Sequence, residues 1–276
     1  MGAIAYARIA VGAALEPLRR RPAELPDTQL WRSGVEIDRE RLAAYDRVCG
    51  FLLSDTLPAT YPHLLAFPSA VELMTSKRFP FGVLGLVHIG NRIEQLRPLS
   101  AGEPLDLLVW TERLADHPRG RTVDVVAEGS LDGRPVWRDR STYLHREGGG
   151  SSDEHKDRPE PPEPDAVWEV PGDVGRRYAA VSADRNPIHL HRVPARLLGQ
   201  PGAIAHGMWT KARCLAALQG HLPAAFAVDV AFKTPVRLPS RIAFASRRDD
   251  DGNWSFALHD APSGKPHLEG TLTPSS

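Results

Sequence analysis

The chain has 276 residues, with 34 basic residues (Lys and Arg) against 34 acidic ones (Asp and Glu), so its formal net charge is zero. This balance gives no electrostatic reason to expect nucleic acid or an anionic membrane as the main partner. An apolar content of 42% excludes a chain that is disordered as a whole, and the length fits one or two domains.

The cysteines and the amino terminus indicate the compartment. Cys49 and Cys214 form no CxxC pair and no disulfide framework, which favours a reducing compartment. The mildly apolar residues 3–15 contain Arg8 and precede three consecutive arginines, the reverse of the order in a signal peptide. No run of about 18 apolar residues is present, as a membrane-spanning helix would need. We therefore expect a soluble, cytoplasmic protein.

The first half of the chain predicts one helix followed by four strands. Residues 66–75 (AFPSAVELMT) have the composition of a short helix. Asp132-Gly133 is a strong signal for a tight hairpin between two strands. Strand-like segments follow the helix at residues 86–96, 105–114, 122–131 and 135–144.

A polar segment divides the chain near its middle. Residues 147–165 read EGGGSSDEHKDRPEPPEPD, with three consecutive glycines, many charges and almost nothing to bury. Such a segment cannot offset its ordering entropy. We interpret it as a flexible linker between an amino-terminal domain, residues 1–146, and a carboxy-terminal domain, residues 166–276.

The second half predicts the same order of elements. Residues 205–219 place Met208, Ala212 and Leu215 on one face of a helix, and Gly220 ends that helix. Turn residues separate the strand-like segments that follow at 225–233, 241–247, 254–259 and 267–273.

The two halves also align residue by residue. PHLLAFPSAVELM, starting at Pro62, lies over PGAIAHGMWTKAR, starting at Pro201, at an offset of 139 residues. Residues 97–99 lie over residues 234–236 at an offset of 137 residues. A helix followed by about four antiparallel strands, repeated once, predicts two copies of one α+β unit.

Asp184 and His189 are candidates for acid–base chemistry. They lie in the segment YAAVSADRNPIH, with Asn186 and Pro187 between them. Pro187 disfavours a helical conformation for Asn186, so an extended or turned segment would aim the carboxylate and the imidazole into one cavity, where they would deprotonate a water. A D-x-N-P turn is also ordinary loop chemistry, in which Asp and Asn cap their own backbone. On these residues alone both interpretations stay open.

Gly207 is a candidate for binding an oxyanion. It stands in AHGM at the expected start of a helix, where backbone N–H groups have no intrahelical acceptor and the helix dipole favours negative charge. The Gly207 N–H is therefore able to hold the oxygen of a polarised carbonyl. The alternative is that His206 and Gly207 only cap the helix where backbones approach closely.

Together these segments resemble a known family. YAAVSADRNPIHLHRVPA followed by IAHGM is similar to the signature of the MaoC-like (R)-specific enoyl-CoA hydratases, also called hydratase 2. LPATYPHLLAFP and GLVHIGNRIEQLRPLSAGEPL in the first half resemble the amino-terminal half of two-domain members. The family pattern has Gly where this chain has Ala183. The resemblance implies an α+β double hot-dog fold, in which each antiparallel sheet wraps a central helix.

The resemblance also implies an activity and residue roles. The activity is the reversible addition of water to a trans-2-enoyl thioester of coenzyme A or an acyl carrier protein, which gives an (R)-3-hydroxyacyl thioester. Asp184 and His189 would handle the water, and the Gly207 N–H would hold the thioester oxygen. No metal or redox cofactor would be needed, because the thioester itself acidifies the α-proton. The supporting residues would be Ser182, Asn186 and His206.

The first half lacks the residues of this site. Pro68, which has no N–H to donate, lies over Gly207, and Phe67 lies over His206. No D-x-N-P-x-H run precedes the linker. We expect one active site per chain, with the first domain shaping the acyl tunnel, and a homodimer stays open.

Other polar residues have weaker claims. His189 and His191 form an H-x-H pair, but no carboxylate or cysteine stands at a ligand spacing, so we expect no metal. Cys214 faces the apolar stripe of its helix and is expected to be buried. Four basic residues are weak candidates to meet the phosphates of coenzyme A and are otherwise expected on the solvated surface: Lys211, Arg213, Lys233 and Arg237.

Three classes of function follow from these patterns. The first is a hydratase or dehydratase acting on acyl thioesters. The second is a hot-dog thioesterase, which would use a carboxylate and a helix N-terminus but has no need of the D-x-N-P-x-H unit. The third is a protein that binds acyl thioesters without catalysis. An assay that follows both the enoyl absorbance and the release of free thiol separates the three.

Overall fold

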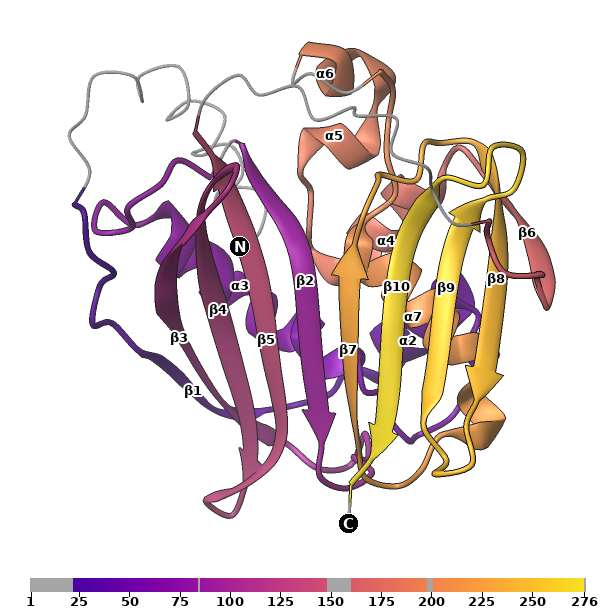
Figure 1. Ribbon diagram of the computed structural model, residues 1–276. Helices are drawn as coiled ribbons and strands as arrows, with labels where there is room; N and C mark the ends of the chain where they lie inside the picture. Colours follow the sequence, from indigo (N-terminus) through magenta and orange to yellow (C-terminus); the bar gives the residue numbers. More distant parts are fainter. Residues whose placement is uncertain (1–21, 84, 148–159, 198–200, 276) are drawn as a thin grey trace.

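The computed structural model describes residues 22–83, 85–147, 160–197 and 201–275. Ten antiparallel strands form one sheet in the order β1-β3-β4-β5-β2-β7-β10-β9-β8-β6 (Figure 1). The strands of the first half are β1 (Leu30–Val35), β2 (Leu86–Gln95), β3 (Leu105–His117), β4 (Gly120–Leu131) and β5 (Arg134–Arg146). The strands of the second half are β6 (Ala166–Val170), β7 (Phe226–Phe232), β8 (Ser240–Arg248), β9 (Trp254–Asp260) and β10 (Pro266–Pro274).

The strand order is the same in both halves when it is followed outward from the middle of the sheet. β2 pairs with β7 at the centre, and the short strands β1 and β6 form the two edges. Asn91 of β2 is paired with Val230 of β7, and these residues are separated by the offset of 139 that the alignment of the halves predicts. The predicted α+β double hot-dog fold is therefore confirmed.

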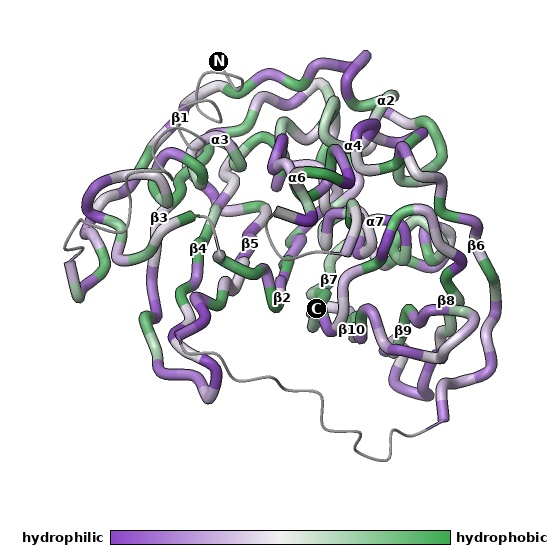
Figure 2. Tube along the Cα trace, turned by 90° about the horizontal axis from the view of Figure 1, so that it is seen from above, coloured by the Kyte–Doolittle hydropathy of each residue, from purple (hydrophilic) through white to green (hydrophobic). Residues whose placement is uncertain are grey.

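The longer helices lie on one face of this sheet. Figures 1 and 2 show α2, α3, α4 and α7 on the same side of the strands from two directions. In α7 the predicted apolar stripe of Met208, Ala212 and Leu215 is buried, and Cys214 is buried as expected. The helices are α2 (Arg39–Cys49), α3 (Tyr61–Thr75), α4 (Val174–Ser182), α5 (Pro187–Leu190), α6 (Arg192–Leu197) and α7 (Gly207–Ala217), followed by the short 3-10 helix η2 (Gln219–His221).

All eight strands that the sequence predicts are present, with ends that agree to within three residues. Their burial alternates, as in β3, where Leu105, Leu107 and Val109 point into the core. Asp132 and Gly133 have φ values of 49° and 72°, the positive angles that a two-residue type I′ hairpin turn requires.

The elements that the sequence analysis missed are the edge strands β1 and β6 and the helices α2, α4, α5 and α6. α3 also begins at Tyr61, five residues earlier than predicted, and contains Pro68 in its interior. Pro62 suits the first turn of a helix, where its missing N–H would have no partner. Residues 178–182, expected to be extended or turned, are the last part of α4, because Val174, Tyr178 and Val181 form a buried helical stripe.

The predicted linker lies between the last strand of the first half and the first strand of the second half. The first half ends with β5 at Arg146 and the second begins with β6 at Ala166. Residues 160–165 are exposed, whereas residues 148–159 lie outside the described residues, so the domain boundaries stay a prediction. No described helix has the length and apolar character to cross a membrane.

Candidate active site

A turn after α4 places Asp184. The helix ends at Ser182, and Ala183 follows in the left-handed conformation with φ of 63°. Glycine is the usual residue here, because this conformation costs a residue with a Cβ atom about 1 kcal/mol. This is the position where the family pattern has Gly. In the first half, α2 ends in the same way at Gly50, and the buried Phe51 stands where the second half has Asp184.

Polar side chains fix the backbone around Asp184. The Asp184 N–H donates to Ser182 Oγ at 3.1 Å, and the Asn186 N–H donates to Asp184 Oδ1 at 3.1 Å. Asn186 is extended, with φ of −56° and ψ of 125°, and its Oδ1 accepts from the Ile188 N–H at 3.3 Å. The capping interactions of an ordinary D-x-N-P turn are therefore present. Asp184 makes them and still lines the pocket, so the two interpretations are compatible.

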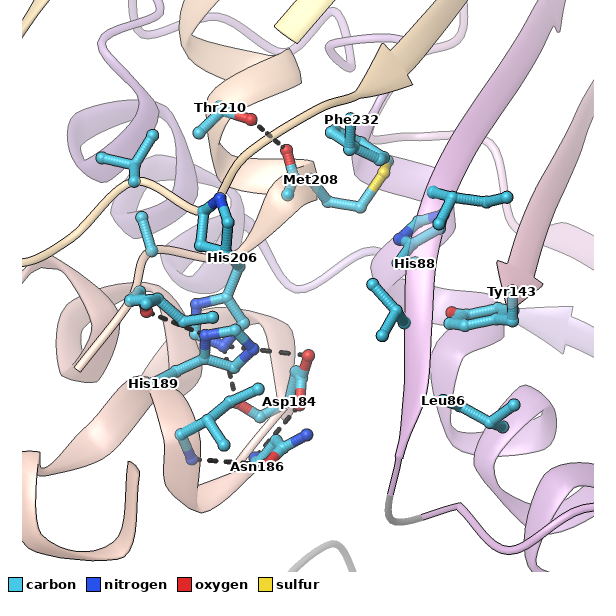
Figure 3. Close-up of a pocket in the computed structure, with 18 of the residues that line it drawn as sticks. Leu86, His88, Tyr143, Asp184, Asn186, His189, His206, Met208, Thr210 and Phe232 are labelled. Carbon is cyan, nitrogen blue, oxygen red and sulfur yellow. Dashed lines mark hydrogen bonds and ion pairs between the residues drawn. The ribbon is translucent and has the colours of Figure 1, made fainter. Parts of the chain in front are cut away.

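Two imidazoles stack beside Asp184 (Figure 3). The ring centroids of His189 and His206 are 3.7 Å apart. His189 Nδ1 lies 2.8 Å from the Ile204 carbonyl oxygen, and His206 Nε2 lies 3.1 Å from the Asp184 carbonyl oxygen and 3.8 Å from Asp184 Oδ2. Since a carbonyl oxygen only accepts, His189 Nδ1 carries a hydrogen, and Nε2 of the neutral ring keeps its lone pair.

Burial keeps both imidazoles neutral. It lowers the pKa of His189 below its usual value, against the opposing effect of the Asp184 carboxylate. Burial and the neighbouring His189 lower the pKa of His206 to about 3. At neutral pH His189 is therefore an unprotonated base, the state in which it accepts a proton from water.

Gly207 is the first residue of α7, and His206 stands before it as the N-cap. Its N–H has no acceptor within the helix and lies at the positive end of the helix dipole. A Cβ atom at this position would lie 3.2 Å from the Phe232 ring, so glycine leaves room between the helix and β7. An N–H at this point suits a carbonyl oxygen that gains negative charge.

One pocket is lined by all six residues that the sequence analysis singled out. The opposite wall comes from the first half, and Figure 3 shows His88 of β2 and Tyr143 of β5 across the pocket from Asp184. Sequence analysis expected the first domain to shape the acyl tunnel but named neither residue, although His88 lies in the segment GLVHIGNRIEQLRPLSAGEPL, because which side chains of a strand face the pocket depends on how the halves pack. The roles of the six residues stay predictions: Ser182, Asp184, Asn186, His189, His206 and Gly207.

A metal ion fits this group poorly. Asp184, His189 and His206 each offer a ligand atom within 4.8 Å of the others. However, a metal lies in the plane of each imidazole that binds it, and two rings stacked at an interplanar angle of 27° do not converge on one ion. His191, the other member of the H-x-H pair, is exposed and is not among the residues that line the pocket.

Lys211 corrects one expectation. It is neither on the surface nor placed to meet a phosphate, because its side chain is fully buried. Its Nζ donates to the Asn91 carbonyl oxygen at 3.1 Å, to Asn91 Oδ1 at 2.5 Å and to the Val228 carbonyl oxygen at 3.0 Å. Burial lowers the pKa of Lys211 to about 7. This residue ties α7 to the two central strands.

Pro68, the residue of the first half that aligns with Gly207, has different surroundings. Pro68 is exposed and lies in the middle of α3, so this half has no helix N-terminus at the equivalent point. Phe67, which aligns with His206, lines the pocket instead.

Comparisons with known proteins agree with this geometry. The model of the MaoC-like domain matches residues 154–269. The 3-hydroxyacyl-thioester dehydratase X of Mycobacterium tuberculosis is 36% identical over 269 residues, which are 96% of this chain and 95% of that protein. A crystal structure of HtdX from that organism, 35% identical, matches with a TM-score of 0.81 over 90% of this chain and 100% of the other. A MaoC-like dehydratase from Phytophthora capsici, 19% identical, shares the fold with a TM-score of 0.75 over 91% of this chain and 96% of its own.

The sheet, its two central helices and the pocket between the halves define a double hot-dog protein. Because one relative is this similar along nearly the whole chain, the protein belongs to the family of MaoC-like dehydratases.

Proposed function

We propose that this protein catalyses the reversible hydration of trans-2-enoyl thioesters to (R)-3-hydroxyacyl thioesters. The observation that carries the proposal is that one pocket holds a carboxylate, a neutral imidazole and a free helix N-terminus, contributed by Asp184, His189 and Gly207. The relative from Mycobacterium tuberculosis, named as a 3-hydroxyacyl-thioester dehydratase, supports the same reaction class.

Each group has one task in the hydration direction. The Gly207 N–H donates to the thioester oxygen and stabilises the negative charge that forms there. Asp184 holds the water, and His189 Nε2 accepts one of its protons while the oxygen bonds to C3. That proton then goes to C2, so a hydroxyl and a hydrogen are added across the double bond. The dehydration direction reverses these steps.

Further parts of the proposal concern the cofactor and the thioester carrier. The reaction needs no metal or redox cofactor, because the thioester carbonyl polarises the double bond. Coenzyme A is the carrier we propose, and three basic side chains that line the pocket support it: Arg119, Arg146 and Lys233. An acyl carrier protein presents the same thioester. The homodimer and the cytoplasmic location stay predictions.

The test is the product formed from crotonyl-CoA. We expect the enoyl absorbance to fall without release of free thiol, and chiral analysis to give the (R)-3-hydroxybutyryl ester. Free coenzyme A in step with substrate loss would instead identify a thioesterase. Binding without any chemical change would identify a protein that holds acyl thioesters without catalysis.

A further inference from the structure

Helix α4 lies next to both acid–base residues of the site. Asp184 comes two residues after the last residue of α4, and His189 belongs to the short helix α5, which packs against α4. Figure 3 shows the Asp184 carboxylate beside the His189 imidazole. The positions of both side chains therefore depend on α4, an element that lies outside the D-x-N-P-x-H motif.

Gly175 of α4 lies directly against the backbone of His189. A Cβ atom at position 175 would stand 2.1 Å from the His189 carbonyl oxygen and 3.1 Å from its carbonyl carbon. Glycine is unfavourable within a helix, yet Gly175 is buried in the first turn of α4. Because the neighbouring group is backbone and cannot rotate away, only glycine allows α4 and His189 to approach this closely.

Hydrogen bonds link the position of the His189 backbone to the direction of its ring. The His189 N–H donates to the Asn186 carbonyl oxygen at 3.0 Å, and the ring Nδ1 donates to the Ile204 carbonyl oxygen at 2.8 Å. The Ile204 N–H in turn donates to the Ile188 carbonyl oxygen at 3.1 Å. Since the ring and its backbone are held by the same two segments, a shift of the His189 carbonyl also moves Nε2, the atom that accepts the proton.

Arg41 of the first half holds the other end of α4. Its side chain is partly buried, and its Nε donates to the Val181 carbonyl oxygen at 2.7 Å. Val181 lies in the last turn of α4, where carbonyl oxygens lack a donor within the helix and a cation is favourable. Asp184 follows three residues later, so Arg41 fixes the point at which the turn toward Asp184 begins.

We propose that α4 sets the spacing between Asp184 and His189, with Gly175 and Arg41 as positioning residues. Gly175 seats the backbone of the base, and Arg41 holds the end of the helix that carries Asp184. Neither residue lines the pocket, so each acts through its neighbour and not by contact with substrate. This inference rests on the proposed hydration activity and adds the residues that position its acid–base pair.

The first variant is Gly175→Ala, assayed with crotonyl-CoA. The added methyl group forces the His189 carbonyl and α4 apart, because a contact of 2.1 Å lies far inside van der Waals distance. A misplacement of about 1 Å slows a reaction by about 10²-fold, so we expect kcat to fall by this factor. KM should stay within about twofold, since the groups that bind the thioester are untouched.

Gly270→Ala is the matched control for overpacking. Its Cβ atom would lie 2.3 Å from the Phe256 ring, and neither residue lines the pocket. We expect kcat within about twofold of wild type, because this overlap does not reach the acid–base pair. The Tm of each variant confirms that it is folded.

Arg41→Met tests the other end of α4 without adding a clash. It removes the donor to the Val181 carbonyl oxygen and should lower kcat by about tenfold, the usual effect of one hydrogen bond from a charged group. Arg41→Lys keeps a charged donor and should recover kcat to within about threefold of wild type. Arg47→Met makes the same change at an exposed position of α2 and should have no effect. If Gly175→Ala does not fold, this comparison decides the inference.

A double-mutant cycle separates positioning from general loss of structure. In the His189→Gln background Gly175→Ala should slow hydration further by less than about threefold, because both changes act through the same imidazole. A merely structural effect of Gly175 would multiply in full. The same loss in both backgrounds would therefore overturn the inference, as would a folded Gly175→Ala variant with a near-wild-type kcat. Equal rates of Arg41→Met and Arg47→Met would overturn it for Arg41.

These outcomes are distinct from failure of the proposed function. If the wild-type protein hydrates crotonyl-CoA and the Gly175 and Arg41 variants do so equally well, the proposed function stands and only the positioning role is wrong. If the wild-type protein does not hydrate it, a crystal structure of Gly175→Ala still tests the inference. We expect the His189 carbonyl and imidazole to be displaced from Asp184 by about 1 Å, and an unmoved imidazole would contradict the role of Gly175.

Discussion

The geometry of the site requires an unfavourable backbone conformation at Ala183. This residue takes a left-handed conformation that favours glycine, and the turn it makes directs Asp184 toward His189 and His206. The sequence revealed Ala183 as a departure from the family pattern. It did not reveal the reason, because the conformation follows only from the end of α4, which the sequence analysis missed.

Ala183→Gly is expected to stabilise the protein by about 0.5–1 kcal/mol, because relief of backbone strain exceeds the extra entropy of glycine in the unfolded chain. The measurement is the free energy of unfolding in urea. Gly50→Ala is the matched control at the equivalent position of the first half. It should destabilise, since Gly50 has φ of 85° and a Cβ atom there would lie 2.7 Å from Arg213 Nη1. A loss of stability in Ala183→Gly would contradict this explanation.

At the scale of elements, the eight interior strands were predictable, whereas the edge strands β1 and β6 and the helices α2, α4, α5 and α6 were missed, although Asp38 and Gly50 mark the two ends of α2. The predicted strands have alternating apolar residues and clear turn signals, such as Asp132-Gly133 in the β4–β5 hairpin. β1 is an edge strand with four of its six residues exposed, so its sequence carries no such alternation. β6, the other edge strand, does alternate in burial but has only five residues, too few for the pattern to stand out. The motif residues of the site were found from sequence, whereas the wall with His88 and Tyr143 depends on how β2 and β5 pack against the second half.

The N-terminus of α7 makes a prediction at this scale. Gly207→Pro removes one N–H, and proline suits the first position of a helix after an extended His206. We expect the variant to fold and to hydrate crotonyl-CoA about 10²–10³-fold more slowly, the usual cost of one oxyanion donor.

Gly207→Ala is the control for the contact with Phe232, because it adds the same Cβ atom and keeps the N–H. It should lose less than about tenfold. Pro68→Gly should leave hydration unchanged, since Pro68 is exposed and lies inside α3, where it forms no helix N-terminus. Comparable losses in Gly207→Ala and Gly207→Pro would show that the ring contact matters and the N–H does not.

At the scale of the whole molecule, polar contacts join the two halves at the centre of the sheet. Lys211 on α7 reaches Asn91 on β2, and Asn91 donates to Asp139 on β5. The edge-to-edge pairing of β2 with β7 continues the same join along the backbone. The buried charges at this seam explain why a lysine that the sequence suggested for the surface lies in the core.

Lys211→Met should therefore destabilise the protein strongly. It removes three hydrogen bonds to buried oxygen atoms and the Lys211 charge near Asp139, at a cost of about 2–4 kcal/mol. Lys233→Met makes the same substitution at a partly exposed ion pair with Glu269 and should cost less than about 1 kcal/mol. The free energies of unfolding of both variants in urea measure the difference. Equal losses would show that the buried hydrogen bonds of Lys211 stabilise the protein no more than an exposed ion pair does.

Stability should also fall in acid. The folded protein holds His88 and His206 neutral, with pKa values of about 3, while the unfolded chain protonates them below pH 6.5. Each histidine then favours unfolding by up to about 1.4 kcal/mol per pH unit as the pH falls. Burial raises the pKa of Asp46 to about 6, so protonation of this carboxyl stabilises the folded state as the pH falls. This single group offsets only part of the loss from the two histidines. Urea unfolding at pH 7, 6 and 5 should show a steady loss, and equal free energies at pH 7 and 5 would contradict the burial of neutral histidines.

The central claim is that Asp184 and His189 in the second half carry out the hydration. The most direct measurement is kcat/KM for crotonyl-CoA hydration in Asp184→Asn and His189→Gln, with His191→Gln as the control on an exposed neighbour and Tm to confirm folding. We predict losses of about 10²–10⁴-fold in the first two variants and a rate within about twofold of wild type in the control. A folded Asp184→Asn or His189→Gln variant with a near-wild-type rate would contradict the assignment.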